Sequence, residues 1–515
     1  MSDADDPIAD FDSMAGFLAD PATHGGAETR RIDTHTAAVI LAGERVWKLR
    51  RPVDYGWLDY ATRARRRLSA AREIAWNKGS APGLYIGLGG LVADGTGWRL
   101  VEPGEVVPDE AEPLVVMHRF RQEDLFDRMA AEGRLSPAII RLTGRVIADM
   151  HKAAPVRDGA GHLPAFARTE TEELGSLADL LGAGKVGAFS ATLRALAASH
   201  AELAARRGAR RCHGDLHLRN IVLWRERPAP FDCIEFNDAF TDIDPLYDLA
   251  FLLMDLDHRG DAALGTEVFN AWAERMASEP GAEVETAYGG LALLPFFKAC
   301  RAGIRAKVGA LAARGAEGDE TGEALAEPRA YLDLALRYLE QTRRPRLLAV
   351  GGLSGSGKTT LARALAARLG AVVLRSDAIR KGQWGIDVTR RLPAAAYAPE
   401  ASVKVYDAML ARARLAIEGG ACVILDAAHL RPAEREQAGA LAVELGVPFL
   451  GLWLEAPVAA MKARVAARPP GASDATASVV EQQTGYDIGP IRWHRREAGG
   501  SVEQLIGAAL AELED

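Results

Sequence analysis

The hydrophobic pattern of the first 120 residues predicts a small sheet interrupted by one helix. Apolar or alternating segments of strand length occupy residues 36–41, 45–50, 84–91, 98–101 and 114–117. A turn at Gly43 separates the first two segments, so we expect them to form a hairpin. Residues 58–79 are rich in good helix formers and predict a helix between the second and third strands.

The pattern then becomes helical. Amphipathic segments predict helices at residues 124–132, 137–152, 245–257, 266–278, 284–312 and 324–340, with two more helices across residues 169–206. We therefore expect a small lobe over residues 28–120 and a helical large lobe over residues 121–340. Residues 1–27 are acidic and rich in Ala, Asp and Gly, which predicts a flexible leader with one short helix near residues 11–18.

A second strand-rich region follows residues 341–346, a short, basic, proline-bearing stretch that we interpret as a linker. Strands are expected at residues 347–351, 371–375, 422–426 and 448–455, and a helix at residues 359–369. Strands that alternate with helices indicate an α/β domain with a mainly parallel sheet, here over residues 347–515.

Composition excludes several classes of protein. A hydrophobic content of 48% and a charged content of 26% are those of a folded globular protein. The net charge of −8 argues against a dedicated nucleic-acid binder. The four cysteines have no zinc or disulfide spacing, and the acidic N-terminus is unlike a secretory signal, so we expect a cytoplasmic protein. The apolar stretch 291–297 is too short to span a membrane.

The first candidate for chemistry is the run His213-Gly214-Asp215, with Asn220 five residues after the aspartate. This is the spacing of the catalytic Asp and the metal-binding Asn in protein kinases, where the Asp takes the acceptor hydroxyl's proton. Two acids, Asp232 and Glu235, follow a short downstream segment and both qualify as the second Mg²⁺ ligand. The run therefore predicts phosphoryl transfer.

Upstream, Lys48 lies within the second predicted strand, and Glu73 lies within the helix that follows it. A strand lysine paired with a helix glutamate fits the pair that positions the ATP phosphates in kinases. No G-x-G-x-x-G run precedes Lys48, so the segment near His35 and Gly43 would have to cover the phosphates. This absence weakens a protein-kinase interpretation more than it weakens a kinase fold.

These motifs together resemble the aminoglycoside phosphotransferase family of kinase-like folds. The resemblance rests on His213-Gly214-Asp215, on Asn220, and on the later run Asp244-Pro245-Leu246-Tyr247-Asp248. It implies a bilobal α+β domain that uses ATP and Mg²⁺, with residues 118–120 as the hinge that receives adenine. In that family the acid after the isoleucine is usually Asp, whereas here it is Glu235, so either Glu235 fits the metal or Asp232 shares the role.

The second candidate satisfies the pattern G-x-x-x-x-G-K-[ST] without an error, directly after a buried-strand run. Its backbone N–H groups are expected to cradle phosphate, Lys358 to reach the β and γ phosphates, and Thr359 to bind Mg²⁺. The nucleotide-binding residues predicted here are Gly352, Ser354, Gly355, Ser356, Gly357, Lys358, Thr359 and Thr360.

Further polar residues follow the later strands of this domain. Asp377 comes after the second strand and is a candidate base for an acceptor hydroxyl, with Arg380 on the same helical face. Asp426 ends the third strand as an acid for the Mg²⁺ shell. Arg464 and Arg468 precede a proline- and glycine-containing flap and are candidate lid arginines. The competing interpretations are a helix N-cap for Asp377 and a surface position for Arg464.

Residues 345–515 resemble the small P-loop kinases that include gluconate kinase, chloramphenicol phosphotransferase and zeta-type toxin kinases. The whole chain resembles bacterial fusions of an aminoglycoside-phosphotransferase-like domain with a P-loop ATPase or kinase domain. These resemblances imply a Mg-ATP-dependent phosphotransferase with two nucleotide sites and a small-molecule hydroxyl acceptor. Two alternatives stay open: a nucleotide-operated regulator, and a nucleic-acid 5′-hydroxyl kinase that the acidic balance disfavours.

Overall fold

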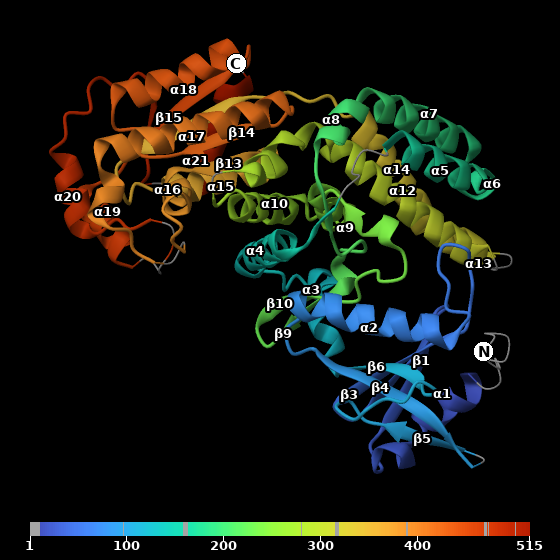
Figure 1. Cartoon of the computed structure of the whole chain (residues 1–515). Helices are drawn as coiled ribbons and strands as arrows, with labels where there is room; N and C mark the ends of the chain where they lie inside the picture. The colour runs from blue at the N-terminus through green and yellow to red at the C-terminus, as the bar shows by residue number, and fades with distance from the viewer. Residues whose placement is uncertain are drawn as a thin grey trace. The chain divides into compact units, whose positions relative to one another are not determined.

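The computed structural model of the chain describes residues 11–95, 97–157, 163–279, 281–314, 319–387, 390–467, 471, 473–499 and 501–514. The chain divides into two compact units (Figure 1). Unit 1 consists of Met1–Asp158 and Ala209–Asp244, and unit 2 consists of Gly159–Gly208 and Pro245–Asp515. None of the described helices has the combination of length and apolar character that crossing a bilayer requires.

Unit 1 contains an antiparallel sheet with the strand order β1-β2-β3-β6-β4-β5. The predicted hairpin is confirmed, because β2 and β3 pair from Ala37↔Arg50 to Ala42↔Arg45. Lys48 lies in β3 between β2 and β6. The strands are β1 (Thr29–Asp33), β2 (Ala37–Ala42), β3 (Arg45–Arg50), β4 (Tyr85–Asp94), β5 (Gly97–Val101) and β6 (Glu112–His118).

Each face of this sheet has its own helix. Helix α1 (Phe11–Ala19) buries Ala15 and Leu18 against Trp47 and Leu49 of β3. The described part of the predicted leader is therefore packed rather than loose. Helix α2 (Arg63–Ser80) lies on the other face, where Ala70 packs with Val115 and Met117 of β6 (Figure 1). Because side chains alternate along a strand, β3 directs Trp47 and Leu49 to α1, and Lys48 and Arg50 to α2.

The candidate catalytic loop of unit 1 lies between two small sheets. Strand β8 pairs with both β7 and β11, and β9 forms a hairpin with β10. The loop, residues 212–220, therefore leaves one sheet and enters the other. The other described elements of unit 1, which include the strands of these two sheets, are η2 (Pro21–His24), η3 (Gln122–Asp124), α3 (Phe126–Ala131), α4 (Pro137–Ala153), β7 (Val156–Arg157), β8 (Ala209–Arg211), η4 (Leu218–Asn220), β9 (Ile221–Trp224), β10 (Arg227–Pro230), η5 (Asp238–Phe240) and β11 (Asp242–Ile243).

Unit 2 begins with a helical region. Its elements are α5 (Leu163–Gly175), α6 (Ala178–Leu181), α7 (Ala183–Ser199), α8 (Ala201–Arg206), α9 (Pro245–His258), α10 (Ala262–Met276), α11 (Ala282–Val284), the π-helix η6 (Glu285–Gly289), η7 (Leu291–Leu293), α12 (Leu294–Ala313), α13 (Asp319–Ala324) and α14 (Ala326–Glu340). The helical stretch expected at residues 284–312 is helical in the structure, but it is divided among α11, η6, η7 and α12. Gly290 separates η6 from η7, and Pro295 lies in the first turn of α12, a position that suits proline.

The rest of unit 2 is an α/β layer. Five strands in the order β13-β14-β12-β15-β16 are all parallel, which confirms the predicted fold class. Helices α15 and α21 bury Leu361, Leu365 and Ile506 against one face (Figure 1). The elements are β12 (Leu347–Gly352), α15 (Lys358–Leu369), β13 (Val372–Arg375), α16 (Ser376–Gln383), η8 (Ala394–Tyr397), α17 (Pro399–Glu418), β14 (Val423–Asp426), α18 (Pro432–Glu444), β15 (Phe449–Glu455), α19 (Val458–Ala466), α20 (Ala477–Thr484), β16 (His494–Glu497) and α21 (Val502–Glu514).

Candidate active sites

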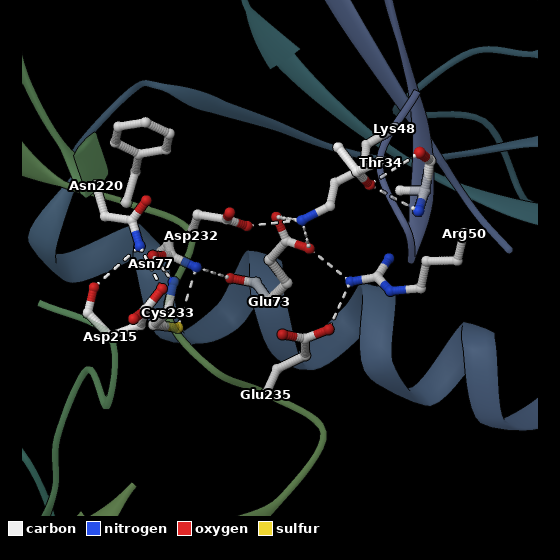
Figure 2. Close-up of polar contacts among 12 residues, drawn as sticks. Thr34, Lys48, Arg50, Glu73, Asn77, Asp215, Asn220, Asp232, Cys233 and Glu235 are labelled. Atoms are coloured by element: carbon white, nitrogen blue, oxygen red, sulfur yellow. Dashed lines mark hydrogen bonds and ion pairs between the residues drawn. The ribbon is translucent and has the colours of Figure 1, made fainter. Parts of the chain in front are cut away.

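The first site is built around Lys48 of β3. Its Nζ donates to both carboxylate oxygens of Glu73 on α2, at 3.2 and 3.1 Å (Figure 2). Glu73 is fully buried. Burial opposes ionisation of Lys48, but the carboxylates of Asp232 and Glu73 outweigh it and raise the pKa of Lys48. The predicted pair of Lys48 and Glu73 is therefore present in the structure as a direct contact.

Asp232 is the second carboxylate on Lys48. Lys48 Nζ lies 2.6 Å from Asp232 Oδ1, and the Asp232 backbone N–H donates to the Tyr85 hydroxyl at 3.1 Å. The residue has a φ of 59°, which turns the chain sharply after β10. Burial opposes its ionisation, but Lys48 lowers the pKa of the carboxyl below its usual value. Its side chain is still 47% exposed, so it can reach a ligand.

Asp215 and Asn220 face each other across the catalytic loop. Asn220 Nδ2 donates to Asp215 Oδ2 at 2.8 Å and to the Asp215 carbonyl at 2.9 Å (Figure 2). The His213 ring also fastens the loop, with Nε2 2.9 Å from the Phe231 carbonyl oxygen. Gly214 has a φ of 83°, and a Cβ there would lie 2.9 Å from the carbonyl oxygen of residue 240, so the turn requires glycine.

Glu235 lies in a different environment from Asp232. It is 4% exposed, and its Oε1 accepts hydrogen bonds from Tyr60 (2.5 Å), Ser69 (2.6 Å) and Arg50 (3.0 Å). Burial opposes its ionisation, but Arg50 and Lys48 outweigh that effect and lower the pKa of Glu235. The two candidate Mg²⁺ ligands therefore have different partners. Asp232 contacts Lys48, whereas Glu235 neutralises the buried Arg50.

Arg50 is a residue of this site that the sequence did not single out. It is 1% exposed and lies between Glu73 and Glu235, to which its Nη2 donates (Figure 2). A signal was present, because Arg50 is two residues from Lys48 and so shares its face of β3. Asn77 of α2 was also missed: its side chain accepts a hydrogen bond from the Cys233 backbone N–H at 3.2 Å and so anchors the loop beside Asp232.

The second site is the loop between β12 and α15. Its glycines have left-handed backbone, with φ values of 137° at Gly352, 81° at Gly355 and 102° at Gly357. A Cβ on Gly352 would lie 2.5 Å from the Leu454 carbonyl oxygen, and one on Gly355 equally close to that of Met461. Only glycine fits this path, which ends at the N-terminus of α15 where anions are favoured.

One predicted P-loop residue, Thr359, contacts the end of β14. Thr359 Oγ1 donates to Asp426 Oδ2 at 2.7 Å. Asp426 is 5% exposed, and this burial raises the pKa of its carboxyl. Lys358 Nζ donates to the Leu353 carbonyl at 2.8 Å and so folds back over the loop. Thr360 is exposed on α15.

The remaining predicted residues of this domain differ in position. Arg464 Nη1 lies 3.4 Å from the carbonyl oxygens of Gly355 and Ser356, so it contacts the phosphate loop directly. Asp377 is partly exposed in the first turn of α16, and the N-cap of that helix is Arg375. Arg380 is 7% exposed and donates to the Ala396 carbonyl at 2.6 Å. Arg468 lies outside the described residues.

Comparison with known proteins agrees with this geometry. A model of the phosphotransferase enzyme family matches residues 28–284. A protein of Mycobacterium tuberculosis, described as uncharacterized, is 31% identical over 501 residues that cover 93% of this chain and 94% of that protein. The chain belongs to the phosphotransferase enzyme family. A model of an AAA domain matches residues 347–486, so this phosphotransferase carries a P-loop domain after its kinase-like domain.

A Mycobacterium bovis protein, also described as uncharacterized, matches with the same identity and coverage. Two solved structures match separate parts of the chain. A gluconokinase from Sinorhizobium meliloti covers 34% of this chain and 94% of its own at 20% identity, with a TM-score of 0.26. A choline/ethanolamine kinase family protein from Mesorhizobium loti covers 64% and 98% at 18% identity, with a TM-score of 0.37.

Proposed function

We propose that the protein is a Mg-ATP-dependent phosphotransferase that acts on hydroxyl groups of small molecules through two nucleotide sites. The observation that carries the proposal is the double contact of Lys48 with Glu73 and Asp232. It joins a phosphate-binding lysine, its helix partner and a metal-binding acid, which is the set that phosphoryl transfer requires.

In the kinase-like site, Asp215 takes the proton of the acceptor hydroxyl, and Lys48 orients the phosphates of ATP. Asn220 donates its amide N–H to Asp215 and so fixes the carboxylate (Figure 2). Carboxylate and amide oxygens are hard ligands that suit Mg²⁺, so Asp232 and Asn220 would hold the metal. Bound there, Mg²⁺ would neutralise charge on the transferring phosphate. Glu235 instead neutralises Arg50.

In the P-loop site, the backbone of the glycine loop and Lys358 bind phosphate, and Asp377 is the base for an acceptor hydroxyl. Thr359 and Asp426 offer a hydroxyl and a carboxylate oxygen 2.7 Å apart, a donor set that would hold Mg²⁺. Arg464 contacts the loop carbonyls and is placed to counter phosphate charge. Arg380 donates to the Ala396 carbonyl and so fixes the backbone of η8 beside Asp377's helix. The four free cysteines fit a reducing, cytoplasmic compartment.

The proposal is tested by incubating a cytosolic metabolite extract with Mg-ATP and the intact protein, Asp215→Asn or Lys358→Ala, followed by mass spectrometry. We expect a new phosphorylated species that disappears in one variant, which assigns its acceptor to that site. Loss in both variants indicates sequential or coupled reactions. If the intact protein binds ATP at both sites and forms no phosphorylated species, the protein is a nucleotide-operated regulator and the proposal is wrong.

A further inference from the structure

Helix α10 belongs to the stretch matched by the phosphotransferase family, yet it lies along the α/β sheet of unit 2. Strand β13 is at the edge of that sheet, so its outer N–H and C=O groups need partners from outside the sheet. Asn270 of α10 supplies both: its Nδ2 donates to the Ala371 carbonyl at 2.9 Å, and its Oδ1 accepts from the Val373 N–H at 2.7 Å. One side chain thus pairs with two backbone groups at the start of the edge strand.

The C-terminal end of α10 is also fixed. Arg412 of α17 donates to the Ala277 carbonyl at 2.9 Å. Gly382 of α16 approaches so closely that a Cβ there would collide with the carbonyl oxygen of Ser278. Glu274 lies three residues before Ala277, at this fixed end of the helix. Glu274 is therefore held at a defined position against the sheet.

A chain of charged contacts runs from Glu274 to the P-loop. Arg375, the last residue of β13, lies 3.3 Å from Glu274 Oε2 through its Nη1 and 3.6 Å from Asp426 Oδ2 through its Nε. The same oxygen of Asp426 accepts the hydrogen bond of Thr359. The side chains of Glu274, Arg375 and Asp426 are 20%, 11% and 5% exposed, so solvent screens these contacts weakly.

We propose that Glu274 is a positioning residue that tunes the affinity of the P-loop site for Mg²⁺, acting through Arg375 on Asp426. A guanidinium beside a metal-binding carboxylate competes with the metal for that carboxylate. Glu274 binds Nη1 of the same guanidinium and offsets part of its positive charge. Arg375 then attracts Asp426 less strongly, which leaves the Asp426 carboxylate available to Mg²⁺. The P-loop domain thereby depends on a residue that its own family match, residues 347–486, does not contain. The inference rests on the proposed nucleotide binding at Lys358 and Thr359.

The test uses the full-length chain with Lys48→Ala, so that binding of a fluorescent ATP analogue reports on the P-loop site. We expect Glu274→Gln, which keeps the shape and removes the charge, to raise the Mg²⁺ concentration for half-maximal binding about 10-fold, as substitutions behind a metal ligand do. Adding Arg375→Met to Glu274→Gln should bring the Mg²⁺ requirement back toward that of the parent, because the competing cation is gone.

Asn270→Ala is the matched control, since it removes a contact of the same helix without changing charge. It is expected to lower the unfolding temperature and to leave the Mg²⁺ requirement unchanged. If Glu274→Gln folds and its Mg²⁺ requirement equals that of the parent, or if Asn270→Ala raises the requirement equally, the inference is overturned. If the parent binds no Mg-ATP, or Lys358→Ala leaves its binding intact, the proposed function of the P-loop site fails instead.

Discussion

Lys48 Nζ lies 2.6 Å from Asp232 Oδ1, although 184 positions separate the two residues along the chain. Three elements meet at this contact, because Lys48 comes from β3, its other partner Glu73 from α2, and Asp232 from the turn after β10. The acid that we assign to Mg²⁺ is thus held by the lysine that we assign to the phosphates. Changes at either residue should affect both roles.

Removal of the Lys48 charge is the first test of this arrangement. We expect Lys48→Met to lower kcat/KM at the kinase-like site about 100-fold or more, because a positioned cation then no longer faces the phosphate charge. The reaction found with the metabolite extract provides the assay. The matched control is Lys78→Met, since Lys78 is exposed on the neighbouring helix α2. Equal losses in both variants would show that charge near α2, not the position of Lys48, matters.

The different environments of the two loop acids give a second prediction. Asp232→Asn should raise the Mg²⁺ requirement of the kinase-like site and leave the unfolding temperature nearly unchanged, because its side chain is half exposed. Glu235→Gln should instead lower stability by about 3–5 kcal/mol, since it leaves the buried Arg50 with less opposing charge. Urea unfolding and Mg²⁺ titration of both variants measure the contrast. If Glu235→Gln instead raises the Mg²⁺ requirement and Asp232→Asn lowers stability, Glu235 is the Mg²⁺ ligand.

The sequence could not choose between these acids, and the reason is physical. Both follow β10 within a few residues, so order along the chain allows either to reach a metal. What separates them is Arg50, a buried cation that needs a carboxylate partner and finds it in Glu235. A contact between residues 185 positions apart leaves no local pattern. The long side chain of glutamate, which seemed a departure from the family pattern, serves a buried ion pair.

The P-loop was predictable because its chemistry is local. Glycines at positive φ, a lysine and a threonine lie within the short segment from Gly352 to Thr359, and the hydrophobic pattern predicted the strand and helix on either side. Strand β16 (His494–Glu497) had no such signal, because all four of its residues are polar and mostly exposed. Arg380 was placed on the right helix, but its partners in η8 and α17 could not be read from spacing.

The contact between Thr359 and Asp426 gives a third prediction. Thr359→Ala should abolish Mg²⁺-dependent nucleotide binding at the P-loop site, since it removes one of two oxygen ligands. Thr359→Ser keeps the hydroxyl and should retain binding within a few-fold. Titration of a fluorescent ATP analogue, with and without Mg²⁺ and in the Lys48→Ala background, measures the effect. Equal loss in both variants would point to packing of the threonine methyl group in place of metal binding.

His429 gives the fourth prediction, which concerns acid stability. The residue follows β14, is fully buried, and packs between Tyr406 and Trp493, with ring centroids 5.4 and 5.0 Å away. Neither of its ring nitrogens has a hydrogen-bond partner among the described residues. Burial in this setting lowers the pKa of His429 from 6.5 to about 3.

The sign of the effect follows from proton uptake. Between pH 6.5 and about 3, the unfolded chain binds a proton at residue 429 that the folded protein does not bind. The free energy of unfolding should therefore rise with pH over this window, by about 1.4 kcal/mol per pH unit from this group. His429→Asn removes the titrating ring and tolerates the φ of 49°, so it should flatten the slope by about that amount.

This slope is measured by urea unfolding at several pH values. Tryptophan fluorescence monitors the unfolding, because Trp493 contacts the His429 ring. His35→Asn is the control, since it removes an exposed histidine where His429→Asn removes a buried one. An unchanged slope in His429→Asn, with the fold intact, would mean that the imidazole can be protonated in the folded protein. A flattened slope would show that a neutral histidine is built into the turn that follows Asp426, beside the phosphate loop.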